Sequence, residues 1–262
     1  MKSKLYTTDK KSLLSIIERN LDDFYGKCSN HPNFNSHRSD KINWIQSKYA
    51  DWPDCIFNVN FEGLNIGAEI LQVKALIREM KAPNGWTVGP LTKPPNLGKM
   101  LEDYNFSNVY YQAGMALDLK SLEFNNLGSN KLEIKIVNND RMLKQWKNTV
   151  SSVFKIKIDF ELLKYLLIEK ESRFYLGFYN GEPISSLLLY LSSGVAGLHA
   201  VSTLPEYRNK GFGLAISGVA LKEAYKMGYK IGVLQASELG EYVYRKLGFK
   251  KYCDIFSYEL QE

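Results

Sequence analysis

The chain has 262 residues, of which 45% are hydrophobic and 24% are charged, which is the make-up of an ordinary globular protein. Its net charge of +6 is small, its basic residues are scattered, and no apolar run could cross a bilayer or act as a secretory signal. The three distant cysteines, Cys28, Cys55 and Cys253, argue against a disulfide framework or zinc site and favour reduced thiols in a cytoplasm.

The first third of the chain has weak periodicity after an opening helix, in which Leu13, Leu14, Ile16 and Ile17 recur at helical spacing. The polar residues 28–40 are predicted to form a loop. A strand is expected at 55–63 and a helix at 66–81. The residues expected on the buried side of that helix are Ile70, Val73, Ala75, Leu76 and Met80.

Three further elements are predicted before a polar stretch at 120–130: a short strand at 85–90, a helix within 91–106 that begins after prolines, and a strand at 108–119. The polar stretch predicts a domain boundary. We therefore expect two domains, 1–125 and 126–262.

The second half is predicted as strand, two helices, three strands, helix, strand, helix and strand. Asn180-Gly181 and Ser193-Gly194 mark the turns between the three central strands. Gly228 and Gly248 end the last two helices. This pattern is typical of an α+β domain with a mixed sheet and helices on its faces.

A weak internal repeat relates the two halves. Each half contains a short helix, an aromatic residue after its end, and a strand. Aligning the two aromatic residues sets three pairs against each other: Leu101 and Tyr244, Asn105 and Gly248, and Phe106 and Phe249. Asparagine and glycine both tolerate the left-handed conformation that ends a helix.

The stretch LPEYRNKGFGLA, from Leu204 to Ala215, joins a predicted strand to a predicted helix. Arg208, Gly211 and Gly213 fit the spacing R-x-x-G-x-G. Such a turn can aim backbone amides and the helix N-terminus at one anion, and a pyrophosphate suits it. The spacing differs from the G-x-G-x-x-G of a Rossmann site. A plain surface turn with solvated charges is the alternative.

The segment from about Lys131 to Glu262 resembles the GNAT superfamily of acyl-CoA N-acyltransferases. The R-x-x-G-x-G turn is similar to its pyrophosphate motif, and SELGEYVYRKLGF is similar to its closing helix. The resemblance implies a mixed, mostly antiparallel, split sheet with helices on both faces. The first half resembles the degenerate, GNAT-like N-terminal half of two-part members.

The resemblance also implies the cofactor, acetyl-CoA, with no metal. The backbones of Val201 and Thr203 would hold the pantetheine arm, and residues 208–213 the pyrophosphate. The full set expected to bind the cofactor is Val201, Ser202, Thr203, Arg208, Asn209, Lys210, Gly211, Phe212, Gly213, Ser237 and Tyr244. For Ser237, a helix cap is the alternative.

Tyr244 is implied as the general acid for the leaving thiolate. Leu239, Val243 and Leu247 are predicted to form the packing stripe of its helix, and Gly240 leaves room beside the phenol. A packing role, as one of 17 tyrosines, is the alternative.

The sequence offers more than one candidate for the general base. The position where relatives carry a glutamate is about Gly197, which cannot serve. Strand alternation places His199 on the same face as Val201 and Thr203, and its ordinary pKa suits proton abstraction. A packed histidine, or a chain of waters, is the alternative.

These observations predict an N-acetyltransferase that moves an acetyl group from acetyl-CoA directly to a primary amine of a small molecule or peptide. The expected partners are acetyl-CoA and the amine, with neither nucleic acid nor membrane, in a monomer or homodimer. A non-catalytic module that binds or senses acyl-CoA is the alternative. A nucleic-acid binder fits less well because no basic cluster is present.

Overall fold

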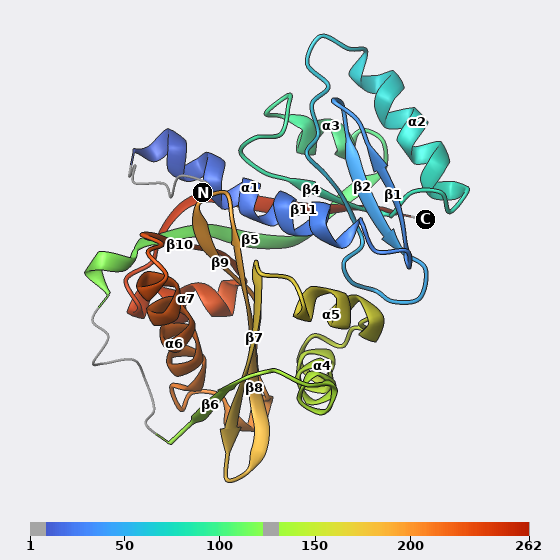
Figure 1. The fold of residues 1–262 in the computed structure, drawn as a ribbon. Helices are drawn as coiled ribbons and strands as arrows, with labels where there is room; N and C mark the ends of the chain where they lie inside the picture. The colour runs from blue at the N-terminus through green and yellow to red at the C-terminus, as the bar shows by residue number, and fades with distance from the viewer. Residues whose placement is uncertain (1–8, 123–130, 262) are drawn as a thin grey trace.

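The computed structural model describes residues 9–122 and 131–261 (Figure 1). These residues form one sheet with the strand order β1-β2-β3-β4-β11-β5-β10-β9-β8-β7-β6. All neighbouring strands are antiparallel except β3 with β4 and β9 with β10. The predicted mixed, mostly antiparallel sheet is confirmed. The described residues contain no helix with the length and apolar character of a membrane span.

The strands are β1 (Phe34–Arg38), β2 (Asn43–Ser47), β3 (Cys55–Phe57), β4 (Gly85–Val88), β5 (Phe106–Asp118), β6 (Glu133–Ile136), β7 (Ser172–Tyr179), β8 (Glu182–Ser192), β9 (Val195–Thr203), β10 (Ile231–Ala236) and β11 (Lys250–Leu260). The α-helices are α1 (Lys10–Cys28), α2 (Ile66–Arg78), α3 (Leu97–Glu102), α4 (Asp140–Phe154), α5 (Phe160–Leu167), α6 (Phe212–Lys226) and α7 (Glu238–Lys246). Two short 3-10 helices, η1 (Leu119–Ser121) and η2 (Pro205–Tyr207), follow β5 and β9.

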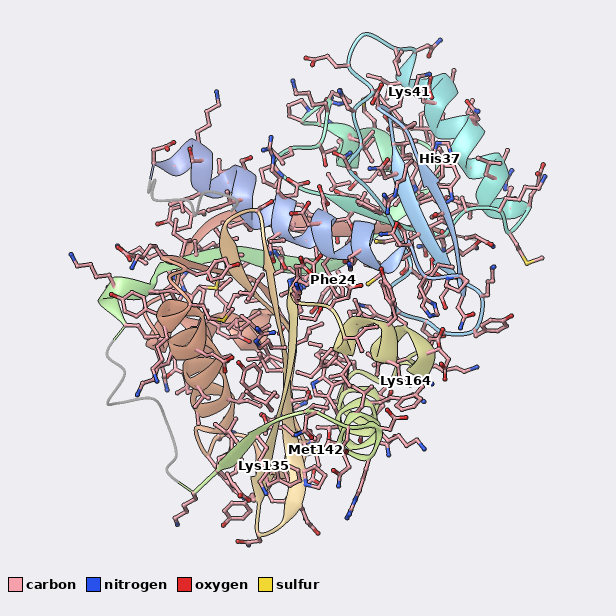
Figure 2. All side chains as sticks on the ribbon, in the orientation of Figure 1. Phe24, His37, Lys41, Lys135, Met142 and Lys164 are labelled. Carbon is pink, nitrogen blue, oxygen red and sulfur yellow. The ribbon has the colours of Figure 1, made fainter. Side chains whose placement is uncertain are left out.

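Helices cover both faces of the sheet. On one face, α1 packs with α4 and α5 around Phe24, near the middle of the molecule (Figure 2). On the other face, α2 and α3 pack over β4 and β11, while α6 and α7 pack over β5, β9 and β10. Successive side chains of a strand point to opposite faces of the sheet. On β11, Ile255 therefore packs against α1, whereas Phe256 packs with the cluster of α2 and α3.

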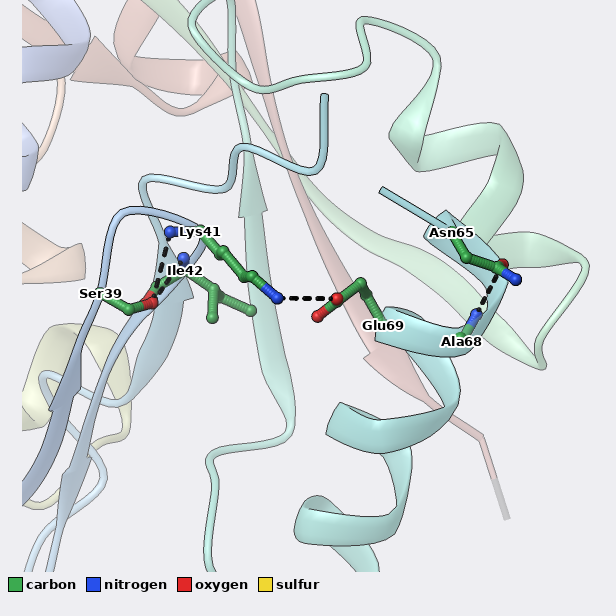
Figure 3. A network of polar contacts seen from close by, with 6 residues as sticks. All are labelled: Ser39, Lys41, Ile42, Asn65, Ala68 and Glu69. Atoms are coloured by element: carbon green, nitrogen blue, oxygen red, sulfur yellow. Dashed lines mark hydrogen bonds and ion pairs between the residues drawn. The ribbon is translucent and has the colours of Figure 1, made fainter. Parts of the chain in front are cut away.

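Polar side chains fix the ends of the peripheral elements. The side chain of Asn65 caps α2 by accepting a hydrogen bond from the amide of Ala68 at 3.2 Å. Lys41, after β1, forms an ion pair with Glu69 of α2 at 3.1 Å (Figure 3). The Ser39 hydroxyl accepts hydrogen bonds from the next turn's amides and shapes the β1–β2 connection.

Strand β5 connects the two halves of the chain. It lies between β10 and β11 and pairs antiparallel with both, so β10 and β11 meet only through it (Figure 1). The first half therefore supplies a central strand to the sheet of the second half. The predicted boundary between 125 and 126 lies outside the described residues, and the division into two domains stays a prediction.

The structure corrects three details of the first half. Residues 28–40, predicted as loop, contain β1. Phe34 is the only buried residue of this strand, so its sequence lacks the alternation of apolar and polar residues by which a strand is predicted. The strand predicted at 55–63 is limited to β3. Two residues predicted on the buried side of α2 are exposed: Ala75, and Met80, which lies after the end of this helix, has a left-handed φ of 55° and is 81% exposed.

The weak repeat has matching local geometry in both halves. Asn105, three residues after the end of α3, has φ 71°, and Gly248, two residues after the end of α7, has φ 92°, so both residues adopt the left-handed conformation, as predicted. Phe106 and Phe249, one residue later, are both buried. The strands that follow, β5 and β11, pair with each other. That the first half is a degenerate GNAT-like copy stays a prediction.

Candidate active site

The sheet splits between β9 and β10. The two parallel strands pair at three positions, ending with Leu198 opposite Leu234, and then diverge. Beyond this point β10 still pairs with β5, and β9 still pairs with β8. The β10-facing backbone groups of residues 199–203 are therefore left without a neighbouring strand. Exposed strand edges of this kind offer hydrogen bonds to an extended ligand.

A β-bulge lies at the split. Ala200 has φ 47°, and the register between β8 and β9 shifts at this point. The bulge turns His199 and Ala200 toward α1 and α4, whereas Val201 packs with the α6 and α7 cluster. The prediction that His199 shares a face with Val201 and Thr203 is therefore wrong, because strand alternation is interrupted between them.

The predicted pyrophosphate loop folds at the end of β9. Asn209 and Gly211 are left-handed, with φ 62° and 78°, and Gly211 precedes the first residue of α6. The first backbone bond of α6 runs from the Ala215 amide to the Gly211 carbonyl. The earlier amides of the first turn have no partner within the helix and point out of its N-terminus.

Two cations lie beside that helix end. The Arg208 side chain donates from Nε to the Thr203 carbonyl at 3.2 Å, and Lys210 donates to the Glu206 carbonyl at 3.2 Å. Both side chains are exposed. A Cβ placed on Gly213 would come no nearer than 3.9 Å to a neighbouring side chain, that of Thr203. The loop, the helix end and the end of β9 thus form one positively charged surface, and a Cβ at Gly213 would fit there without a steric clash in the free protein.

Helix α7 brings a phenol to the split. Ser237 caps it by accepting a hydrogen bond from the Gly240 amide at 3.2 Å, which confirms the cap prediction. Tyr244 is buried against the α6 and α7 cluster, whereas Leu239 is 81% exposed. The predicted packing stripe is therefore wrong at Leu239, because α7 turns Tyr244 itself toward the sheet. A Cβ on Gly240 would lie 3.5 Å from the Tyr244 ring, so the glycine leaves space there.

A cavity of about 590 Å³ lies at the split. On one side it is lined by Val201, Ser237, Gly240 and Tyr244, and His199 also lines it. The opposite side is lined by aromatic and aliphatic side chains, namely Phe24, Tyr25, Trp52, Val150, Phe154 and Ile156. Both halves of the chain therefore contribute to one cavity.

His199 belongs to a buried network that begins on α1. Its Nε2 donates to Asn20 Oδ1 at 2.9 Å, and Asn20 Nδ2 donates to the Tyr190 carbonyl and the Ser192 hydroxyl. Gly197 makes room for this pair: a Cβ there would collide with Asn20 Oδ1 and lie 2.8 Å from His199 Nε2. The space beside Gly197 is thus occupied by the side-chain amide of Asn20, from the first helix.

Burial changes the acidity of both candidate catalytic groups. Desolvation lowers the pKa of His199 to about 4, so the ring is neutral at pH 7. Desolvation also raises the pKa of Tyr244 well above its usual value, although the neighbouring Ser217 hydroxyl opposes this effect. Tyr244 therefore keeps its proton at neutral pH. These states fit a proton donor and a neutral proton acceptor.

The predicted site residues fall into two groups. His199, Val201, Ser237 and Tyr244 line the cavity, whereas residues 208–213 lie at the helix end beyond Thr203. Between them, the Ser202 side chain is turned away and hydrogen-bonded to Ser186 at 2.6 Å, which leaves Ser202 only its backbone for a ligand.

Asn20 is a site residue that sequence reasoning missed. It is fully buried on the apolar side of α1, between Ile17 and Leu21. An asparagine on the apolar face of a predicted helix is a signal for a polar partner, because a buried amide needs hydrogen bonds. The identity of that partner, 179 residues away in the chain, requires the fold.

Comparison with known proteins agrees with this geometry. Residues 140–249 match the Acetyltransferase (GNAT) family. No curated protein matches the sequence.

Two solved structures share the fold over nearly the whole chain. A GCN5-related N-acetyltransferase from Kribbella flavida is similar with a TM-score of 0.72 at 12% identity, covering 94% of this chain and 96% of that one. A GCN5-related N-acetyltransferase from Sphaerobacter thermophilus gives 0.62 at 14% identity, covering 95% and 92%. The fold extends in both cases beyond the residues that match the family.

Proposed function

We propose that the protein transfers an acetyl group from acetyl-CoA to a primary amine of a small molecule or peptide, because residues 140–249 match the Acetyltransferase (GNAT) family. One observation carries the proposal. The split between β9 and β10 connects a positively charged helix end with a cavity that contains a protonated phenol and a neutral imidazole.

The residues present fit acetyl-CoA. The amides at the start of α6, with Arg208 and Lys210 beside them, suit the pyrophosphate. The β10-facing edge of residues 199–203 suits the amides of the pantetheine arm. When bound, acetyl-CoA supplies an acetyl thioester that a neutral amine can attack directly, so no covalent enzyme intermediate is required.

In this proposal Tyr244 Oη donates a proton to the departing sulfur. Burial raises the pKa of the phenol, and the same low-dielectric surroundings also disfavour a thiolate. The two acidities therefore move in the same direction, and proton donation stays feasible. Fixed donors in a cavity shielded from water also stabilise developing charge more than they would in water.

His199 accepts the proton that the amine loses. Its Nε2 is committed to Asn20, which leaves Nδ1 as the accepting nitrogen. With its pKa lowered to about 4, this imidazole is a weak base for a free alkylammonium ion. It is adequate for an amine that becomes much more acidic as it bonds to the acetyl carbon.

Calorimetric titration with acetyl-CoA tests the cofactor site. Gly211 lies at φ 78°, so a side chain there would also strain the backbone, whereas Gly213 has no such requirement and would accept a Cβ without a steric clash in the free protein. We expect Gly213→Val to abolish binding while the far-ultraviolet circular dichroism stays unchanged. Gly26→Ala, in α1 with a neighbour no closer than 4.0 Å, is the matched control.

The wild-type titration should give one site per chain, since the R-x-x-G-x-G turn occurs once, in the second half. Unchanged affinity in Gly213→Val would refute the assignment of the loop.

A further inference from the structure

The side of the cavity opposite Tyr244 has a uniform chemistry. We call its six lining residues, Phe24, Tyr25, Trp52, Val150, Phe154 and Ile156, the aromatic chamber. They come from α1, the segment before β3, α4 and the turn that follows α4. The Phe24 ring stacks on His199 with ring centroids 5.0 Å apart and lies 5.4 Å from the Trp52 ring, so the chamber begins directly at the imidazole.

The described lining of the whole cavity includes no aspartate, glutamate, lysine or arginine. Its polar members are amides, hydroxyls and the neutral His199. Burial raises the pKa of Tyr25 and the charge of Asp22 contributes to this rise, but Asp22 does not line this cavity; it lines a separate cavity together with Arg19. A ligand in the chamber therefore meets aromatic and aliphatic surface and no compensating charge.

We propose that the amine acceptor is a monoamine whose remaining part is uncharged and aromatic in size, such as an aryl- or arylalkylamine. This inference rests on the proposed function and names the substrate class for the same site. An aromatic ring would pack against Phe24, Trp52 and Phe154, and the amine would reach His199.

The same lining disfavours charged acceptors. A free amino acid would bring a carboxylate without a cation to pair with it, and a polyamine or aminoglycoside would bring further ammonium groups without carboxylates. Burying a charge without a partner of opposite sign is strongly unfavourable. Of the two proposed kinds of acceptor, the arylamines are weakly basic and need no strong base, which agrees with the lowered pKa of His199.

The first test compares acceptors that differ in one group. With saturating acetyl-CoA, kcat/KM is measured for phenethylamine, for phenylalanine, which adds only a carboxylate, and for spermidine. We expect phenethylamine to exceed both by on the order of 100-fold, from the cost of an unpaired buried charge. Equal or higher kcat/KM for phenylalanine or spermidine would overturn the inference and leave the proposed function standing.

The second test asks whether the aromatic part of the amine binds in the aromatic chamber. Phe154 is 45% exposed, so its truncation is compatible with folding. Phe154→Ala should lower kcat/KM for phenethylamine roughly tenfold more than for ethylamine, which has no ring to pack there. Ile168→Ala, 81% exposed and outside the cavity, is the control and should change neither value.

Two further outcomes are decisive. If Phe154→Ala affected both amines equally but reduced the use of longer acyl-CoA donors, the chamber would hold the acyl group and the inference would be wrong. If no amine released CoA from a protein that binds acetyl-CoA, the proposed function would fail as well.

Discussion

His199 Nε2 and Asn20 Oδ1 lie 2.9 Å apart in a buried hydrogen bond between β9 and α1. The Tyr190 carbonyl, 3.2 Å from the other end of the amide, can only accept, so that end must be Nδ2. Asn20 therefore presents an oxygen to the imidazole and requires a proton on Nε2. The first helix of the chain thus sets the tautomer of a histidine in the second half.

Replacing Asn20 tests this relationship. Asn20→Asp places a carboxylate beside Nε2 and should raise the pKa of His199, because an opposite charge stabilises the imidazolium. If His199 accepts the proton of the amine, the acid limb of the kcat/KM profile should move to higher pH. A purely structural role for Asn20 would lower the rate without moving the limb. Ser192→Ala removes only one bond to Asn20 and should leave the limb in place.

Glu18 should make the stability depend on pH. Burial raises the pKa of this carboxyl to about 7, although it accepts a hydrogen bond from the Leu91 amide at 2.6 Å. Above pH 4.5 the unfolded chain releases a proton that the folded chain holds, so this contribution to stability is lost as pH rises toward 7.

Glu18→Gln should make the decline in stability between pH 5 and pH 8 smaller and increase the free energy of unfolding at pH 8, while the carboxyls of Asp22 and Asp54, whose pKa values are also raised by desolvation, keep their part of it. Urea denaturation at pH 5 and pH 8 would measure it, with the exposed Glu62→Gln as the control. A decline of equal size in Glu18→Gln would exclude Glu18 as its source.

Local sequence patterns predicted the second half well. The order of elements from β6 to β11 is the predicted one, and the cap at Ser237 and the left-handed turn at Asn180-Gly181 follow from side-chain chemistry alone. These features depend on neighbours within a few residues. Strand β1 was missed because an edge strand with one buried residue lacks the alternation that marks a strand.

The site was harder to predict because its geometry is not local. The bulge at Ala200 reverses the face of every later residue on β9, and no glycine or asparagine marks it. Asn20 and Phe24 reach His199, and Trp52 reaches Phe24, only because β5 joins the two halves in one sheet. Such contacts follow from topology rather than from any sequence window.

Tyr244→Phe tests whether Tyr244 is the general acid. If Tyr244 protonates the leaving sulfur, kcat should fall by about 10²-fold, the lower end of the usual effect of acid–base groups, because water can substitute. The KM for acetyl-CoA should change less. Tyr242→Phe, on the same helix and 66% exposed, is the matched control. Full activity of Tyr244→Phe, with the chemical step rate-limiting, would defeat the assignment.

The isolated second half should not fold to the native state. Residues 126–262 lack β5, and β10 and β11 would then each lose their shared neighbour. We expect this fragment to be unfolded or aggregated, as judged by circular dichroism and gel filtration. Adding residues 1–125 as a separate chain should restore soluble, folded protein. A fragment that folds cooperatively by itself would instead support an independent C-terminal domain.

Product stoichiometry tests the central claim, acetyl transfer to an amine, most directly. Purified protein is incubated with acetyl-CoA and an amine, free CoA thiol is titrated, and the amine product is quantified by mass spectrometry. The account predicts one N-acetylated amine for each CoA released, with both lost in Gly213→Val. Acetyl-CoA binding without amine-dependent CoA release, across aromatic, aliphatic, amino-acid and polyamine acceptors, would contradict it and indicate a non-catalytic acyl-CoA-binding protein.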